Sequence, residues 1–305
     1  MPEFTPIVVT GIILLGGVIG FLSGLFGVGG GFLLSPMLNI VFGIRMPVAI
    51  GSGLCQMIGT ATTAMLRHWK NAAVDVKLAA IMLGGSIVGV EFGARALEAL
   101  KHAGAVTLFG QALAWDWLVP MCSYVVLLLL IGVTTFRESL GTGRHARITG
   151  TVKRRVGRGL FNRVAMPPML PLAATEGKPV ALVPVILLSV FIGALSGFLG
   201  IGGGVVIVPI LIYWVGTSTR FAVGTSLLVI LINAVIGTVA HALRDNVSLT
   251  LVCLLLVSST LGASLGAALH HRLKAHQVRL YLSLLLFVSV AVILGRMLAE
   301  FGVFG

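Results

Sequence analysis

Ten apolar segments follow one another along this chain of 305 residues, and most of them are close to 20 residues long. A helix of about 20 apolar residues can cross the hydrocarbon core of a bilayer. Only 10% of the residues are charged, whereas a soluble domain carries about 25%, so most of the surface must face lipid. The sequence therefore predicts an all-α integral membrane protein. The segments are residues 7–26, 32–42, 48–66, 78–97, 117–136, 180–199, 205–215, 222–243, 249–269 and 278–298.

The second half of the chain repeats the first in one constant register, which aligns Gly20 with Gly193. This repeat register holds without a gap over about 70 residues, which indicates two copies of one structural unit. Residues 1–136 and 179–305 are therefore predicted to form two transmembrane repeats of about five helical segments each. Other aligned positions include Ser23 and Ser196, Pro36 and Pro209, Ala49 and Ala222, and Gly89 and Gly262.

A basic loop, residues 137–178, joins the two repeats and holds nine Lys or Arg residues against two Glu. Loops rich in Lys and Arg lie mainly in the cytoplasm, so this loop is predicted to be cytoplasmic. It supplies much of the net charge of +12, and anionic lipid headgroups explain that charge more simply than nucleic acid does. With this loop inside, each repeat crosses the membrane an odd net number of times, so the repeats are expected to have inverted topology.

Two glycine runs stand at equivalent places in the repeats, each between a full-length segment and one of only 11 residues. Glycine costs a helix about 1 kcal/mol relative to alanine, and broken backbone inside a membrane must line a cavity or be buried in protein. A helix that starts after a break offers free N–H groups to an anion. The runs predict broken or re-entrant helices and an anion site, with close helix packing as the alternative. The predicted site residues are Gly29, Gly30, Gly31, Gly202, Gly203 and Gly204.

The next segment of each repeat carries polar residues on an apolar background. In the first repeat they recur at helical spacing and share one face. Neutral donors of this kind can hold an oxyanion without binding it irreversibly. Interhelical hydrogen bonding is the alternative, and for the threonines it is the favoured interpretation. The predicted substrate-binding residues of these segments are Ser52, Gln56, Thr60, Thr225, Ser226 and Asn233.

Two pairs of residues allow a functional and a structural interpretation. His68 and His241 occupy equivalent helix ends and either couple transport to protons or anchor the helices at the membrane interface. Glu91 and Arg95 are four residues apart on one segment, and we expect them to form a structural ion pair rather than a gate.

Cysteine and proline residues near the predicted site also allow two interpretations. Cys55 lies beside Gln56 and is either a contact for a sulfur-containing substrate or an inert buried thiol. Pro36 and Pro209 follow the glycine runs and either free a carbonyl group near the site or only kink the helix.

Enzyme motifs are missing from the sequence. It contains no HExxH, no GxSxG and no GK[ST] phosphate-binding loop, and no carboxylates cluster within the apolar segments. We therefore predict no catalytic residue, no metal site, no cofactor and no pumping driven by ATP.

At residues 20–31 with Pro36, and at their copy in residues 193–209, the chain resembles the sulfite exporter TauE/SafE family, also called the 4-toluene sulfonate uptake permease family. The resemblance covers both repeats and leaves out the basic loop. It implies transport of sulfur-containing anions, such as sulfite or organosulfonates, through the inner membrane of a bacterium. The resemblance leaves the preferred anion and the direction of transport open.

The expected function is that of a secondary transporter in which the two repeats rock around a site in the middle of the membrane. An anion channel and a membrane scaffold without transport are the alternatives. The expected partners are a small anionic substrate and the lipid bilayer, without nucleic acid, and the sequence leaves a homo-oligomer open.

Overall fold

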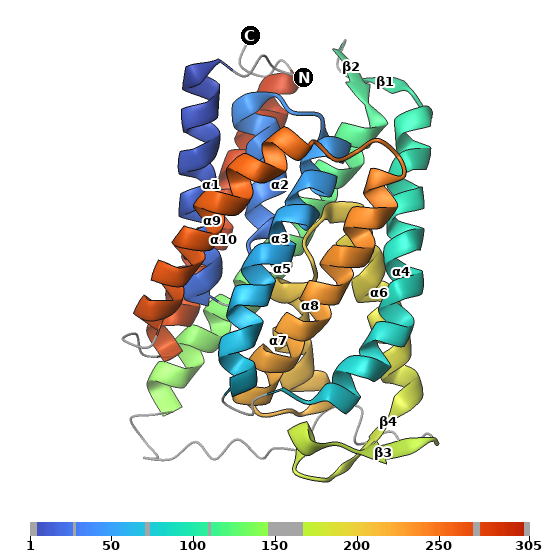
Figure 1. The fold of residues 1–305 in the computed structure, drawn as a ribbon, viewed down its shortest axis with the longest axis vertical. Helices are drawn as coiled ribbons and strands as arrows, with labels where there is room; N and C mark the ends of the chain where they lie inside the picture. Colours follow the sequence, from blue (N-terminus) through green and yellow to red (C-terminus); the bar gives the residue numbers. More distant parts are fainter. Residues whose placement is uncertain are drawn as a thin grey trace.

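The computed structural model describes residues 5–26, 29–70, 74–108, 111–145, 167–270 and 275–301. The first half holds α1 (Pro6–Phe26), α2 (Gly31–Phe42), α3 (Met46–Lys70), α4 (Val76–His102) and α5 (Trp115–His145). The second half holds α6 (Leu182–Leu199), α7 (Gly204–Ile210), a π-helix (Leu211–Val215), α8 (Thr219–Ala242), α9 (Leu249–His270) and α10 (Ala275–Glu300). Seven helices within the described ranges are long and apolar enough to cross a bilayer. The prediction of an all-α membrane protein is confirmed (Figure 1).

Most helices extend beyond the apolar segments that predict them. The segment over residues 48–66 becomes α3, which runs from Met46 to Lys70, and the segment over residues 78–97 becomes α4, which runs to His102. An apolar run marks only the part of a helix that lies in hydrocarbon, whereas the backbone hydrogen bonds continue into the polar end.

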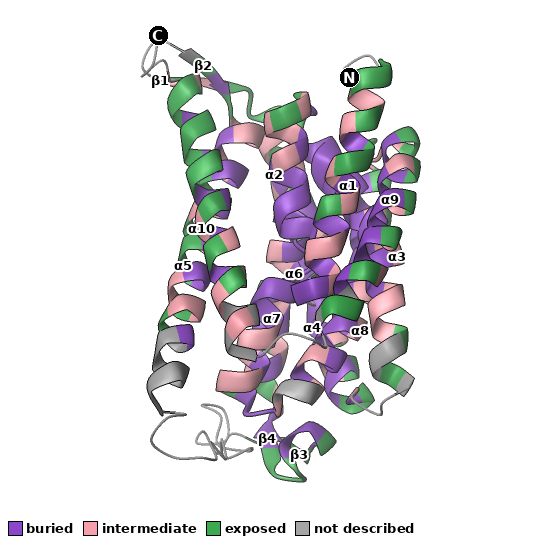
Figure 2. Cartoon of the chain, turned by 90° about the vertical axis from the view of Figure 1, so that its left-hand side faces the viewer, coloured by how far each residue is buried: buried purple, intermediate pink, exposed green. Residues whose placement is uncertain are grey.

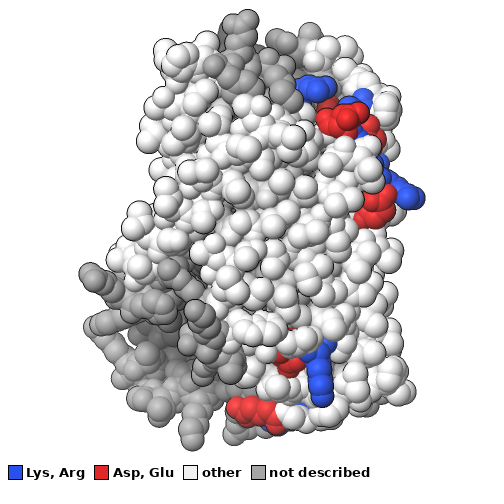
Figure 3. Space-filling model, viewed as in Figure 1, with Lys and Arg blue, Asp and Glu red and all other residues white. Residues whose placement is uncertain are grey.

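The outer surface of the helices is apolar, as contact with lipid requires. Leu14, Phe92 and Leu261 are 65%, 68% and 66% exposed. Lys, Arg, Asp and Glu form only small groups on the face drawn in Figure 3, and most of that face carries no charge. Buried residues line the interior of the helix bundle (Figure 2). The apolar outer surface and the buried interior are those of a multi-pass membrane protein.

Helix pairing follows the repeat register. Helix α1 packs along α9, and their equivalents α6 and α4 pack along each other in the same way. A methyl group added to Gly20 of α1 would overlap the backbone of Ser259 in α9, and one added to the equivalent Gly193 of α6 would overlap the backbone of Ser86 in α4. Positions 86 and 259 are also equivalent, so the two halves make the same helix contacts. That the two copies are inverted in the membrane stays a prediction.

Two further pairs of helices join the two halves. Helices α3 and α8, which are equivalent, pack against each other and also contact α9 and α4. Helices α5 and α10 form a further pair, seen at one side of the bundle in Figure 2.

Two short hairpins interrupt the helices at opposite ends of the molecule (Figure 1). Strands β1 (Ala105–Leu108) and β2 (Gln111–Ala114) pair antiparallel between α4 and α5. Strands β3 (Met169–Pro171) and β4 (Pro179–Ala181) pair antiparallel ahead of α6, with a 3-10 turn (Ala173–Thr175) between them.

The predicted basic loop over residues 137–178 differs from the structure at both of its ends. Helix α5 continues to His145, so the start of that range is helical. Residues 146–166 lie outside the described ranges. The last part of the range belongs to the β3–β4 hairpin, which docks onto the helix bundle rather than standing free.

The docking of the hairpin depends on Asp75, a buried carboxylate at the start of α4. Its Oδ1 accepts a hydrogen bond from the amide of Leu78 at 3.0 Å, which caps α4. Its Oδ2 accepts one from the amide of Ala174 in the hairpin at 2.8 Å. The carbonyl of Ala174 in turn accepts from the amide of Ser218, the N-cap of α8. The hairpin therefore links the N-terminal ends of α4 and α8.

Candidate functional site

Each glycine run separates two helices, as the sequence predicts. Helix α1 ends at Phe26 and α2 begins at Gly31, while α6 ends at Leu199 and α7 begins at Gly204. The N-cap glycines, Gly30 and Gly203, have φ angles of 72° and 85°. Their neighbours Gly29 and Gly202 are also left-handed. Residues with a Cβ rarely adopt this conformation, so glycine is what allows the sharp turn between the helices.

The two breaks meet inside the protein. We call residues 29–31 and 200–204 the glycine loops. A methyl group on Gly31 would overlap the carbonyl oxygen of Gly200, so the two loops are in direct backbone contact. The side chains of Met57 in α3 and Ile230 in α8 touch both Gly29 and Gly202. Residues that are equivalent in the repeat register thus surround a common centre.

Backbone amides that have no acceptor within their own helix lie at the start of each short helix. The carbonyl of Gly30 accepts hydrogen bonds from the amides of Leu33 and Leu34, and the carbonyl of Gly203 accepts from those of Val206 and Ile207. The amides of the two preceding residues in each helix lie in the first turn, where helix geometry supplies no acceptor within the helix. They belong to Gly31, Phe32, Gly204 and Val205, all of which are buried.

The two amide side chains predicted for the site each pair with a serine. Gln56 of α3 donates from Nε2 to the Oγ of Ser259 in α9 at 2.5 Å. Asn233 of α8 accepts at Oδ1 from the Oγ of Ser86 in α4. Ser86 and Ser259 occupy equivalent positions, whereas Gln56 and Asn233 are offset by one helical turn between the repeats.

Polar atoms without a partner remain beside these pairs. Among the described side chains, the buried atoms without a hydrogen bond include Oε1 of Gln56, Nδ2 of Asn233 and Oγ of Ser196. Buried polar groups are normally satisfied, so each exception calls for an explanation such as a ligand. The free Nδ2 of Asn233 has two N–H donors, which suit an oxyanion.

The hydroxyl oxygens of Ser52 and Thr225 accept hydrogen bonds from the amides of loop residues. The Oγ of Ser52 accepts from the amide of Ser248 at 3.0 Å, just ahead of α9. The Oγ1 of Thr225 accepts from the amide of Asp75 at 3.0 Å, just ahead of α4. These two contacts are equivalent in the repeat register.

Thr60 and Ser226 bond to their own helices, so their hydroxyl protons are already used. The hydroxyl of Thr60 donates to the carbonyl of Met57 at 3.3 Å, and that of Ser226 donates to the carbonyl of Val223 at 2.8 Å. Of the predicted polar residues, only Gln56 and Asn233 therefore keep a free polar atom.

The predicted histidine pair has different surroundings at its two positions. His68 lies near the C-terminal end of α3, and its side chain lies outside the part of the structure that is described. His241 is fully buried, and its Nε2 lies 2.8 Å from the carbonyl oxygen of Gly197 in α6, while its Nδ1 has no partner. A buried ring does not fit the interpretation of His241 as an interfacial anchor.

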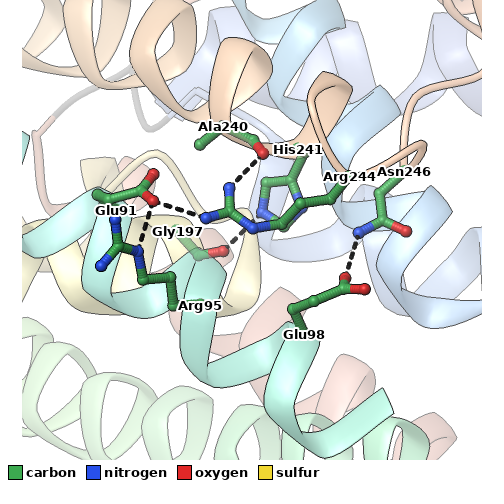
Figure 4. Close-up of polar contacts among 8 residues, drawn as sticks. All are labelled: Glu91, Arg95, Glu98, Gly197, Ala240, His241, Arg244 and Asn246. Carbon is green, nitrogen blue, oxygen red and sulfur yellow. Dashed lines mark hydrogen bonds and ion pairs between the residues drawn. The ribbon is translucent and has the colours of Figure 1, made fainter. Parts of the chain in front are cut away.

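Charged residues surround His241 (Figure 4). Glu91 and Arg95 form the expected ion pair at 2.7 Å, but Glu91 also binds Nη2 of Arg244 at 2.6 Å. The guanidinium of Arg244 also donates to the carbonyl of Ala240. Two turns further along α4, Glu98 accepts from Nδ2 of Asn246 at 3.1 Å. Helix α4 is therefore fastened to the loop between α8 and α9 by an ion pair and a hydrogen bond.

The cysteines and prolines of the predicted site differ in their surroundings. Cys55 is half-buried, and Cys122 and Cys253 are exposed on the outer surface. Pro36 lies inside a continuous α2, whereas α7 ends directly after Pro209 and continues as a π-helix. Proline removes an amide donor at both positions, yet only the second short helix changes its hydrogen-bonding pattern.

Several residues of this centre are not among those the sequence predicts as site residues. Met57 and Ile230 touch both loops, Ser86 and Ser259 hold the amides, and Tyr124 of α5 donates from its hydroxyl to the carbonyl of Leu199, the last residue of α6. The repeat register relates Ser86 to Ser259, two identical polar residues, so the repeat carried a signal for these two. Met57 aligns with a different residue, Ile230, and neither carried such a signal. Among the described residues, no three His, Cys, Asp or Glu side chains gather as metal ligands.

Comparison with known proteins gives a family and several relatives. The family described as "Sulfite exporter TauE/SafE" matches residues 12–293. A probable membrane transporter protein of Xylella fastidiosa (strain 9a5c) is 28% identical over 267 residues, which is 85% of this chain and 84% of that protein. The probable membrane transporter protein YunE of Bacillus subtilis (strain 168) is 24% identical over 284 residues, 91% of this chain and 94% of YunE. The probable membrane transporter protein MJ0441 of Methanocaldococcus jannaschii is 25% identical over 293 residues, which is 91% of this chain and 92% of MJ0441. No solved structure matches significantly.

Proposed function

Because the chain belongs to the sulfite exporter TauE/SafE family, we propose that it is a secondary transporter for small sulfur-containing anions, such as sulfite or organosulfonates. The relatives are named as probable membrane transporters, and the chain is a membrane transporter rather than an enzyme. The preference for sulfur-containing anions and the secondary mechanism are the parts that we propose here.

The observation that carries the proposal is the meeting of the two glycine loops inside the bundle. Both short helices begin there with amides that have no acceptor within the helix, and a helix start favours a negative charge. Asn233 adds two free N–H donors on α8, the helix whose Ile230 touches both loops. These neutral donors can replace part of the hydration shell of an oxyanion without the strong hold of a buried lysine or arginine.

Alternating access is the mechanism that we propose for this site. Helix α1 starts at the end of the molecule where the chain begins, and α6 starts at the opposite end, beside β3 and β4 (Figure 1). This arrangement supports two inverted repeats, which could rock against each other around the glycine loops.

A carrier is favoured over an open channel by the packing at this centre. The glycine loops touch each other, and Met57 and Ile230 lie against both of them. A pore that conducts ions needs a continuous path, whereas a carrier closes the path around its site. A scaffold without transport would gain nothing from two buried helix breaks that share one centre.

We also propose that the protein lies in the inner membrane of a bacterium with the basic segment in the cytoplasm. The charge of residues 137–178 supports this orientation through the positive-inside rule. The β3–β4 hairpin would then lie at the cytoplasmic end, and the β1–β2 hairpin at the outer end.

Anion flux into proteoliposomes tests the proposal. We expect Gly30→Leu and Gly203→Leu to abolish flux of sulfite or of a sulfonate. A side chain is strained at these left-handed positions, and it would crowd Ser23 of α1 in the first loop and Ile192 of α6 in the second, so neither turn could keep its shape. Gly84→Leu is the matched control, since Gly84 lies exposed on α4 with nothing within 4 Å of an added methyl group. Monodisperse protein must be recovered for each variant. Unchanged flux in both loop variants would falsify the site.

A further inference from the structure

Among the described residues of α3, Met57 is the one whose side chain lies close to glycines of both glycine loops. It is fully buried. A methyl group added to Gly29 would lie 2.9 Å from its Cε, and one added to Gly202 would lie 3.2 Å from its Sδ. One added to Gly31 would overlap the sulfur. The side chain of Met57 therefore fills the space that the missing side chains of the two loops leave free.

The equivalent position in the second repeat is Ile230, which makes the matching contacts. Its Cγ2 would lie 3.4 Å from a methyl group on Gly29 and 3.2 Å from one on Gly202. The two side chains differ in mobility, however. Methionine is unbranched and has three rotatable bonds, so it adapts to irregular spaces. Isoleucine in a helix is nearly fixed at χ1. The centre thus has one movable wall and one rigid wall.

We infer that Met57 is the specificity-determining side chain of the transport path: it closes the space between the glycine loops and sets the largest substituent that the anion can carry. This inference rests on the proposed function. The glycines of the loops have no side chains to exclude a substrate, and in the proposed site the amides at the helix starts face the charged oxygens of the anion. The group attached to the sulfur atom must therefore be accommodated beside Met57 and Ile230, where only Met57 can move aside.

Substitution of Met57 should change the size limit and leave the anion chemistry intact. Met57→Ala removes the movable wall, so we expect the flux ratio of benzenesulfonate to sulfite to rise at least about tenfold, the low end of the effect of one methylene group in an apolar pocket. Met57→Ile places the same rigid side chain in both repeats and nearly keeps the volume of the side chain. The flux ratio of benzenesulfonate to sulfite should therefore fall. Methanesulfonate and butanesulfonate fill in the series between these two anions.

The control is Met82→Ala. Met82 is as deeply buried as Met57 but lies on α4, and none of its atoms is among those nearest to any glycine of the two loops. We expect its flux ratio to equal that of the unmodified protein. All rates are measured in proteoliposomes, with the amount of folded protein determined by size-exclusion chromatography.

The outcomes separate this inference from the proposed function. If the unmodified protein carries none of the anions, the proposed function is wrong and the inference falls with it. If the unmodified protein carries sulfite but the ratio stays constant in Met57→Ala and Met57→Ile, only the inference is overturned. Should Met57→Ala not fold, the ratio in Met57→Ile decides, because this variant keeps the core filled.

Discussion

Two neighbouring glycines of α4 allow a direct test of how closely the helices pack. A methyl group added to Gly85 would lie 2.5 Å from the carbonyl oxygen of Ile186 in α6. An ordinary C···O contact between packed helices is about 3.3 Å, so α4 and α6 would have to separate by about 0.8 Å to admit it. At Gly84, one residue earlier, nothing lies within 4 Å of the added methyl group.

The two substitutions should therefore have opposite effects on stability. Both variants gain about 1 kcal/mol of helix propensity, but Gly85→Ala also overpacks a backbone contact, which costs about 2 kcal/mol. A difference of about 2 kcal/mol corresponds to a gap of roughly 4–8 °C in Tm. Thermal unfolding in detergent, followed by tryptophan fluorescence, measures this gap. Equal Tm values for the two variants would refute close backbone packing between α4 and α6.

Three further predictions concern buried polar groups. Asp75→Asn should loosen the β3–β4 hairpin, because the amide that replaces one oxygen cannot accept from Ala174; proteolysis within residues 167–181 should become faster, and an unchanged rate would contradict the docking. Asn233→Leu should lower anion flux, since it removes the free buried donor that we assign to the anion; unaltered flux would show that Asn233 does not bind the anion. His241→Ala should change the pH dependence of uptake, and an identical pH profile would end the hypothesis of proton coupling through this residue.

The helices and their breaks could be predicted from the sequence because both depend on local properties. Apolar runs of sufficient length predict α1 and α6, and three consecutive glycines predict the interruptions ahead of Gly31 and Gly204. The repeat even indicates that the two interruptions occupy equivalent places. These features need no knowledge of which residues meet in space.

The partners of individual polar side chains could not be predicted in the same way. Ser52 and Thr225 align in the repeat, but the sequence does not say that their hydroxyls accept hydrogen bonds from loop amides. Met57 carries no polar signal at all, so its place between the glycine loops appears only once the helices are packed. The β3–β4 hairpin depends on a contact between Asp75 and Ala174, 99 residues apart, which no local pattern records.

The two ends of the bundle are held together by different interactions, so they should respond differently to ionic strength. At one end, α4 holds the loop between α8 and α9 through the pair of Glu91 and Arg244, in which the guanidinium is 17% and the carboxylate 38% exposed. At the other, Asp75 holds Ala174 through a buried hydrogen bond to a neutral amide. Dissolved salt weakens partly exposed ion pairs and screens buried contacts much less. Raising the salt concentration should therefore loosen the end of the bundle where α4 meets the loop between α8 and α9, and leave the end with the β3–β4 hairpin fastened.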